Sequence, residues 1–181
     1  MVFFPSVLLA ESDFSTVNFR INMNQISHIN EKEQTFDADF YLWVTRDQKD
    51  LVKPQFEIIN AATYSNDSSE GMTWENTLDD RVETSMRIKG TFNSHMELSK
   101  FPFDHQSLQI IIEDFNSTEN SMHYLPSKQE STISRDLKLS DWQIQSLHTQ
   151  SQKYKYPFID TGKTEESSYS RYVFSIQIER Q

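Results

Sequence analysis

The chain has 181 residues, a formal net charge of −10 at neutral pH and no cysteine. Its length fits a single domain, and a hydrophobic fraction of 36% with many aromatic residues is enough to form a buried core. The acidic balance disfavours nucleic acid as a partner, because phosphate binding needs clustered Lys and Arg. The lack of cysteine excludes disulfide bonds and thiolate chemistry.

The chain opens with an apolar stretch, and we interpret residues 1–12 as a linker or the remnant of a signal peptide. Residues 13–181 are then predicted to form one domain. No hydrophobic run in the sequence is long enough to span a bilayer.

Apolar and polar residues alternate along several segments, the clearest at 19–23, 36–44, 82–90 and 172–178. A period of two places one side of each segment in a core and the other side in solvent. Repeated at short spacing, the pattern predicts an all-β, immunoglobulin-like antiparallel sandwich of about ten strands. Two polar segments, Thr63–Glu70 and Ser151–Ser168, are expected to be loops, the second long enough to carry a function. The tryptophans are expected in the core: Trp43, Trp74 and Trp142.

The sequence lacks the patterns that mark an enzyme. It contains no glycine-rich phosphate loop, and its five histidines are scattered without metal-ligand spacing. No pair of carboxylates is marked out as an acid and a base. We therefore expect no catalysis, no metal centre and no cofactor. The acidic pairs Asp79-Asp80 and Glu165-Glu166 leave Ca²⁺ open as a modulator, although such pairs are usually solvated surface.

One short segment, Phe101-Pro102-Phe103-Asp104, is more distinctive than any of these features. Proline fixes φ and removes a backbone donor, so the segment predicts a tight apolar turn leading into a strand. It resembles the signature loop of pentameric ligand-gated ion channels, the Cys-loop receptor superfamily, where the loop lies at the base of the extracellular ligand-binding domain. Animal members place a cysteine where this chain has Leu108, so the chain is similar to the bacterial branch.

Further segments in the same order strengthen the resemblance. They are Asn30–Phe36, Lys53-Pro54 with Phe56–Asn60, Ser140–Ile144 and Ile178–Gln181. Together they spread along most of the sequence from Phe14 onward. One departure lies between Trp43 and Lys53, where the family carries an additional loop and strand. Either the third strand is shortened here, or a stretch of the protein is absent from this sequence.

The resemblance implies a ligand site in an aromatic box between two subunits. On the principal side it points to Glu113 as the acceptor for a ligand ammonium and to Phe115 as a ring beside it. The capping loop would be Ser151–Ser168. Further principal-side candidates are Tyr154, Tyr156, Tyr169, Ile59 and Asn60. Aromatic faces attract ammonium groups, so a small cationic amine is the expected ligand.

The resemblance also implies residues at two other surfaces. The complementary side of the ligand site would use Arg46, Glu83 and Ser85. The surface that couples to the pore would use Glu31, Lys32, Glu33, Phe101, Pro102, Phe103, Asp104 and Arg180. We expect Phe101 and Phe103 to pack at the base of the sandwich, at the end opposite Ser151–Ser168.

The implied protein is a homopentamer whose ligand-binding domain gates a separate transmembrane pore domain of the same chain, on the periplasmic or extracellular face of the membrane. Two alternatives remain open. One is a soluble carbohydrate-binding or adhesion sandwich, and the other is a periplasmic sensor module for a metabolite or Ca²⁺. Both explain the alternating strands and the acidity, but neither explains the ordered set of motifs.

Overall fold

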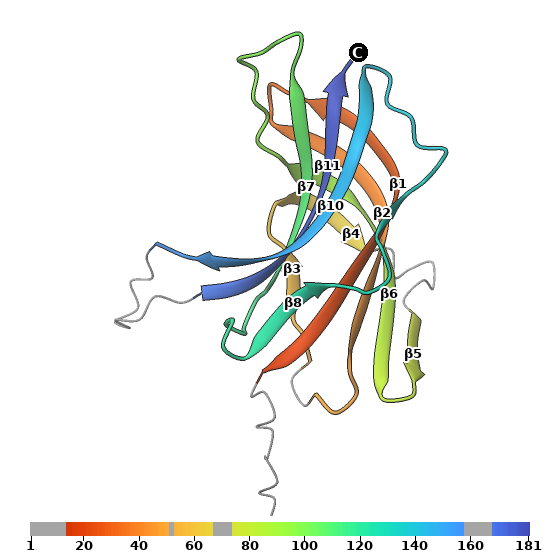
Figure 1. Ribbon diagram of the computed structural model, residues 1–181, viewed down its shortest axis with the longest axis vertical. Coiled ribbons are helices and arrows are strands. Elements are labelled where there is room, and N and C mark those ends of the chain that lie inside the picture. Colours follow the sequence, from red (N-terminus) through yellow and green to blue (C-terminus); the bar gives the residue numbers. More distant parts are fainter. Residues whose placement is uncertain (1–13, 51–52, 67–73, 158–167) are drawn as a thin grey trace, which may run out of the picture.

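The computed structural model describes residues 14–50, 53–66, 74–157 and 168–181 as two packed β-sheets (Figure 1). The first sheet contains β1 (Ser15–Asn30), β2 (Thr35–Asp47), β4 (Ala61–Asn66), β5 (Trp74–Leu78), β6 (Arg81–Asn93), β8 (Met122–Pro126) and β9 (Thr132–Ile133). The second contains β3 (Phe56–Ile58), β7 (His105–Asp114), β10 (Trp142–Lys155) and β11 (Ser168–Arg180). The predicted all-β sandwich is thereby confirmed.

The strand order of the first sheet is β4-β6-β2-β1-β8, with β5 also pairing with β6 and β9 with β1. The order of the second sheet is β10-β11-β7-β3. Neighbouring strands are antiparallel, except that β8 and β9 run parallel to β1. Among the described residues, no helix has the length and apolar character needed to cross a membrane.

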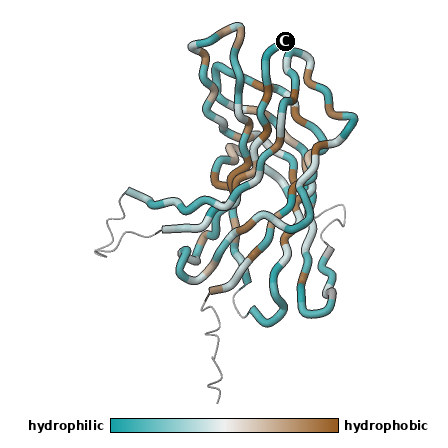
Figure 2. The backbone as a smooth tube through the Cα atoms, in the orientation of Figure 1, coloured by the Kyte–Doolittle hydropathy of each residue, from teal (hydrophilic) through white to brown (hydrophobic). Residues whose placement is uncertain are grey.

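The core lies between the two sheets and is built from the alternating residues that the sequence marked. Phe19, Phe40, Ile110 and Phe174 have at most 1% of their surface exposed. The Phe19 ring lies 4.7 Å from the ring of Tyr124, centroid to centroid. Figure 2 shows hydrophobic segments running through the middle of the molecule and hydrophilic ones at its ends. Burial of this apolar surface is the main favourable term in folding.

The tryptophans divide between the core and the surface. Trp142 is buried, as expected. The expectation is wrong for Trp43, which is half-buried on the other face of β2 beneath the guanidinium of Arg20. Its neighbours Leu42 and Val44 face the core, so the period of two turns Trp43 away. The Trp74 side chain lies outside the described set.

Both predicted loops are partly strand. β10 continues to Lys155 and β11 begins at Ser168, while residues 158–167 lie outside the described ranges. Figure 1 shows this strand pair projecting sideways from the sandwich. β4 likewise covers Thr63 to Asn66, and the rest of that predicted loop is not described. Because the projecting strands have little core to cover, they carry polar residues on both faces and lack a hydrophobic period.

Gly90 allows β4 to approach β6 closely. A Cβ atom built on Gly90 would lie 2.6 Å from the Cβ of Tyr64 and would also overlap the carbonyl oxygen of Thr63. Gly90→Ala is therefore expected to lower the free energy of unfolding by about 1–3 kcal/mol through overpacking. Denaturant unfolding measures this loss. Ser65→Ala, at an exposed position of β4, should change it by less than about 0.5 kcal/mol. Equal, small effects of both changes would contradict the close approach.

Candidate functional site

Strand register gathers five side chains on the outer face of the second sheet. Glu113 stands directly opposite Arg171 across β7 and β11, and Tyr154 stands opposite Tyr169 across β10 and β11. Because side chains alternate along a strand, residues two apart share a face. The outer-face set, which we call the cation cage, is Glu113, Tyr154, Tyr156, Tyr169 and Arg171.

A β-bulge in β10 brings its tyrosines to this face. Ile144 pairs with Ile178 and Ser146 with Gln177, so one extra residue is accommodated between them. A bulge of this kind reverses which side chains of the strand face outward. Beyond it, the even-numbered residues of β10 share the face of Arg171. Tyr154 therefore lies in a strand and Tyr156 just past its end, not in the long loop that we expected.

The cage already holds a cation, the guanidinium of Arg171. Arg171 Nε donates to Glu113 Oε2 at 2.6 Å, and Arg171 Nη2 donates to the Tyr156 hydroxyl at 3.0 Å. That hydroxyl donates in turn to Glu113 Oε1 at 2.7 Å. The guanidinium carbon lies 3.4 Å from the ring centroid of Tyr154. Only 5% of the Glu113 side chain and 10% of the Arg171 side chain are exposed.

Contacts between the tyrosine rings pack the cage together. The surroundings of Tyr156 also keep its hydroxyl protonated. The rings of Tyr154 and Tyr169 each meet that of Tyr156 edge-on, at 4.9 and 5.5 Å. Burial raises the pKa of the Tyr156 hydroxyl, and its hydrogen bond to Glu113 raises it further. The hydroxyl therefore remains a donor at neutral pH.

The structure changes the expected role of Glu113. We expected its carboxylate to await a ligand ammonium, but its donors in the folded domain are Arg171 and Tyr156. A buried carboxylate needs such partners, because an unpaired charge in a dry environment is strongly destabilising. Direct contact between Glu113 and a ligand stays a prediction.

Asp114, which the sequence did not single out, fixes the segment after β7. Its carboxylate accepts hydrogen bonds from the Gln55 and Ser117 amides at 3.0 and 2.6 Å and from the Tyr124 hydroxyl at 2.6 Å. The carboxylate is buried, so these bonds satisfy it. Phe115 follows directly, and its side chain is 67% exposed. The ring of Phe115 is thus exposed to solvent, while the hydrogen bonds of Asp114 hold the backbone beside it in place.

The other principal-side candidates have structural partners. The Asn60 side-chain amide donates to the carbonyls of Asn93 and Gln109, each at 2.8 Å, and its oxygen accepts from the Ile111 amide at 3.0 Å. These bonds tie both sheets together at the turn between β3 and β4. Ile59 in the same turn is half-buried, and its amide donates to the Ile111 carbonyl. Both residues therefore support β7 two positions before Glu113.

The complementary-side candidates are split between two faces of the first sheet. Glu83 pairs with Thr45 and Ser85 with Trp43, so both face away from the core. Arg46 pairs with Val82 on the other face.

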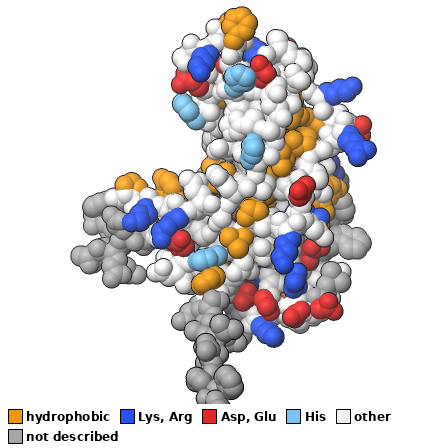
Figure 3. All heavy atoms as spheres, viewed as in Figure 1, with side chains coloured by type: hydrophobic (Ala, Val, Ile, Leu, Met, Phe, Trp, Pro, Cys, Tyr) orange, Lys and Arg blue, Asp and Glu red, His pale blue; other side chains and the backbone are white. Residues whose placement is uncertain are grey.

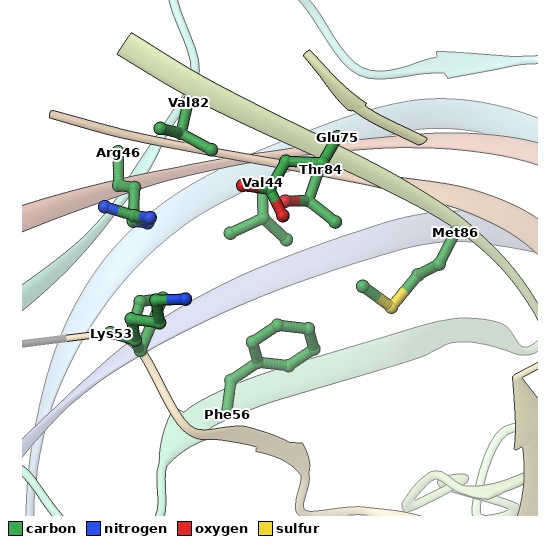
Figure 4. Close-up of a pocket in the computed structure, with 9 residues that line it drawn as sticks. Val44, Arg46, Lys53, Phe56, Glu75, Val82, Thr84 and Met86 are labelled. Atoms are coloured by element: carbon green, nitrogen blue, oxygen red, sulfur yellow. The ribbon is translucent and has the colours of Figure 1, made fainter. Parts of the chain in front are cut away.

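On the core-facing side of the first sheet, Arg46 lines a pocket of about 180 Å³ (Figure 4). In that view Arg46 and Lys53 lie at one end of the pocket and Met86 at the other. The structure brings Arg46 together with Glu83, but not with Ser85, around a second pocket of about 640 Å³. None of the three lies in the cation cage, which belongs to the other sheet.

At the opposite end of β7 and β11, a second charge cluster joins three segments. Arg180 Nε donates to Asp104 Oδ1 at 2.8 Å, and Arg180 also contacts the Glu31 carboxylate. The Arg180 guanidinium carbon lies 4.9 Å from the ring centroid of Phe101 and 4.2 Å from that of Trp142. These contacts bring together the turn after β1 that contains Glu31, the Phe101–Asp104 turn and the end of β11; a role of these segments in coupling stays a prediction.

The two phenylalanines of this turn do not pack as expected. Phe101 and Phe103 lie at the predicted end, beside the C-terminus, but 63% and 82% of their surfaces are exposed. Figure 3 shows a hydrophobic side chain at the tip of this end. Asp104 takes the buried position instead, because Arg180 and Gln106 satisfy its carboxylate. Lys32 and Glu33 are exposed in the neighbouring turn.

No group of three or more His, Asp or Glu side chains within the described ranges could hold a metal ion. Asp79-Asp80 forms an exposed turn, and Glu165-Glu166 lies outside those ranges.

The family model described as neurotransmitter-gated ion-channel ligand binding domain matches residues 43–181. The chain therefore belongs to this family, which is a class of channel binding domains and not of enzymes. None of the curated proteins compared with the chain matches it.

The buried pair in the cage should show strong energetic coupling. Glu113→Gln and Arg171→Gln should each lower the free energy of unfolding by roughly 3–5 kcal/mol, because each leaves its partner charge buried and unpaired. The double variant should lose less than the sum of the two, with a coupling of about 0.5–3 kcal/mol. A double-mutant cycle in urea measures this. Additive losses would contradict a direct pair.

The pair at the other end should give a pH-dependent stability. The hydrogen bond from Arg180 holds the pKa of Asp104 below its usual value of 3.8. A lowered pKa contributes stability that is fully present at neutral pH and is lost as the pH falls through the folded-state pKa.

Asp104→Asn should therefore destabilise the domain at pH 7 by roughly 1.5–3 kcal/mol. Its difference from the wild type should shrink as the pH falls below 3.8. Asp136→Asn, which removes an exposed carboxylate, should have an effect under about 0.5 kcal/mol. Urea unfolding from pH 3 to pH 7 measures both. A difference for Asp104→Asn that does not depend on pH would contradict the assignment.

Proposed function

We propose that this chain is the extracellular ligand-binding domain of a bacterial pentameric ligand-gated ion channel that binds a small cationic amine between subunits. The observation that carries the ligand class is the cation cage. Glu113 and the rings of Tyr154 and Tyr156 already surround a guanidinium. Negative charge and aromatic faces together stabilise ammonium groups by the same electrostatics, roughly 0.5–2 kcal/mol per ring. A carboxylate ligand would meet Glu113 with the same charge.

The placement of the two candidate faces supports a site between subunits. The cage lies at β10 and β11, on one side of the molecule, and β5 and β6 lie on the other side in Figure 1. Glu83 and Ser85 of one copy can therefore meet the cage only of another copy. Contact between two different faces is heterologous, and repeating it with rotation closes a ring. A homopentamer is the ring size that the family implies.

The residues at the base of the sandwich, the end that carries Phe101, Phe103 and Arg180, support a proposed contact with a pore domain. Phe101 and Phe103 expose large apolar rings on the turn that the Asp104–Arg180 contact ties to the end of β11. Exposed apolar patches on an otherwise polar surface mark interaction sites. Arg180 holds this turn and Glu31 in one cluster, so a movement of β11 reaches all three segments. The domain would then face the periplasm or the cell exterior.

A soluble carbohydrate-binding or sensor module is the alternative function. Such a module gains nothing from two exposed phenylalanines at the end remote from its binding site. For this reason we favour the channel domain over the soluble module.

The test uses the full-length protein reconstituted in lipid bilayers. We expect a mass of five subunits and a conductance that n-butylamine opens and butyrate does not. Tyr169→Ala should weaken the amine response by about 0.5–1.5 kcal/mol, because the Tyr156 ring loses the ring that packs edge-on against it. Tyr64→Ala, which removes an exposed tyrosine of β4, is the matched control and should leave the response unchanged. A stable dimer or tetramer, or a response to acids alone, would refute the proposal.

A further inference from the structure

We propose that Arg171 is the residue that sets the affinity of the cage for amines, because its guanidinium occupies the position that a ligand ammonium needs. This inference rests on the proposed function, since it concerns the same site and the same class of ligand. Arg171 lies on β11 two residues after Tyr169, and nothing in the motif pattern marked it. The guanidinium of Arg171 thus competes with a ligand ammonium for the same position in the cage.

The geometry leaves no second cationic position beside Glu113. One carboxylate oxygen accepts Arg171 Nε and the other accepts the Tyr156 hydroxyl. The guanidinium covers the face of Tyr154 at 3.4 Å and lies 5.5 Å from the ring centroid of Tyr156. Glu113 has only 5% of its side chain exposed. An ammonium group can reach the carboxylate only after the guanidinium has left it.

The residues around the pair indicate where a displaced guanidinium can go. Glu57 on β3 is the register partner of Glu113 on the side away from Arg171, and it is exposed. Gln152 on β10 is the register partner of Arg171 on its other side and carries no charge. The row across the sheet is therefore Gln152, Arg171, Glu113 and Glu57. A guanidinium that leaves Glu113 finds a second carboxylate one strand away.

The competition has a simple quantitative consequence. The measured affinity of a ligand is its intrinsic affinity multiplied by the fraction of molecules in the competent state. Here the competent state is the one in which the guanidinium is out of the cage. Because two hydrogen bonds and a stacked ring hold it in, that fraction is small. Removing the tethered cation should raise amine affinity accordingly.

The experiment measures binding of n-butylamine to the full-length protein by calorimetry. Arg171→Gln should raise the affinity at least about tenfold, because the competing guanidinium is gone and the Glu113 carboxyl group is left to accept the ammonium. Arg171→Lys retains a tethered cation and should stay within about threefold of the wild type. The double variant Glu113→Gln with Arg171→Gln removes both charges and should show no gain over the wild type.

A milder variant keeps the test decisive if Arg171→Gln does not fold. Tyr156→Phe retains the ring and removes only the hydroxyl that bridges Arg171 and Glu113. It should raise amine affinity by about twofold to fivefold, because the guanidinium is held less firmly. An unchanged or reduced affinity in this variant would instead mean that the hydroxyl does not restrain the guanidinium, and that would overturn the inference.

The outcomes separate this inference from the proposed function. Amine binding by the wild type with unchanged or weaker binding by folded Arg171→Gln overturns the role of Arg171 alone. Failure of n-butylamine to bind the wild type and every variant overturns both the role of Arg171 and the proposed ligand class. A gain in Arg171→Gln that disappears in the double variant is the result that we expect.

Discussion

The pairing of β7 with β11 is the constraint on which the rest of the molecule depends. Nine register pairs run from Arg171 opposite Glu113 to Glu179 opposite His105, a ladder of about 30 Å at the rise of a strand. Its alternate residues fill the core, and each end carries one buried charge pair. Arg171 meets Glu113 at the cage, and Arg180 meets Asp104 at the base. Because the two arginines belong to one strand, a shift of register would break both pairs and also turn the core residues outward.

Much of the fold could be predicted from the sequence, and the failures have a common cause. The alternation of Phe19, Ile21 and Met23 predicted β1 correctly, because one face of that strand meets the core and the other meets solvent. The end of β10 was taken for a loop. There Ser151 to Lys155 project beyond the sandwich and are polar on both faces, so no hydrophobic period remains to be detected. The bulge between Ile144 and Ser146 also interrupts any period along this strand.

The site could be predicted only in part, since a motif marks positions along the chain but not partners across the sheet. The motif order pointed to Glu113 and Tyr156, which the structure joins by a hydrogen bond of 2.7 Å. Arg171 was missed, because its place opposite Glu113 follows from strand register, which the sequence pattern does not specify. Asp114 was missed for the same reason, since its partners lie on other segments. The turn at Phe101 was placed correctly, but its rings were expected inside. The apolar composition of a turn does not show whether its side chains pack inside the same domain or are exposed for contact with another one.

The two ends of the ladder differ in what their charges can do. At the base, Arg180 is shared by Asp104 and Glu31 and stacked against two rings, so its replacement by an outside group would break four contacts at once. A cluster with this many contacts is expected to hold the three segments rigidly together. In the cage, the hold on Arg171 depends on Tyr156, which lies just past the end of β10, on the part of the strand pair that projects from the sandwich. Strands with few core contacts open at lower free energy than the body of a domain. A movement of these projecting strand ends would therefore alter the contacts of Arg171 before it reached the core of the sandwich.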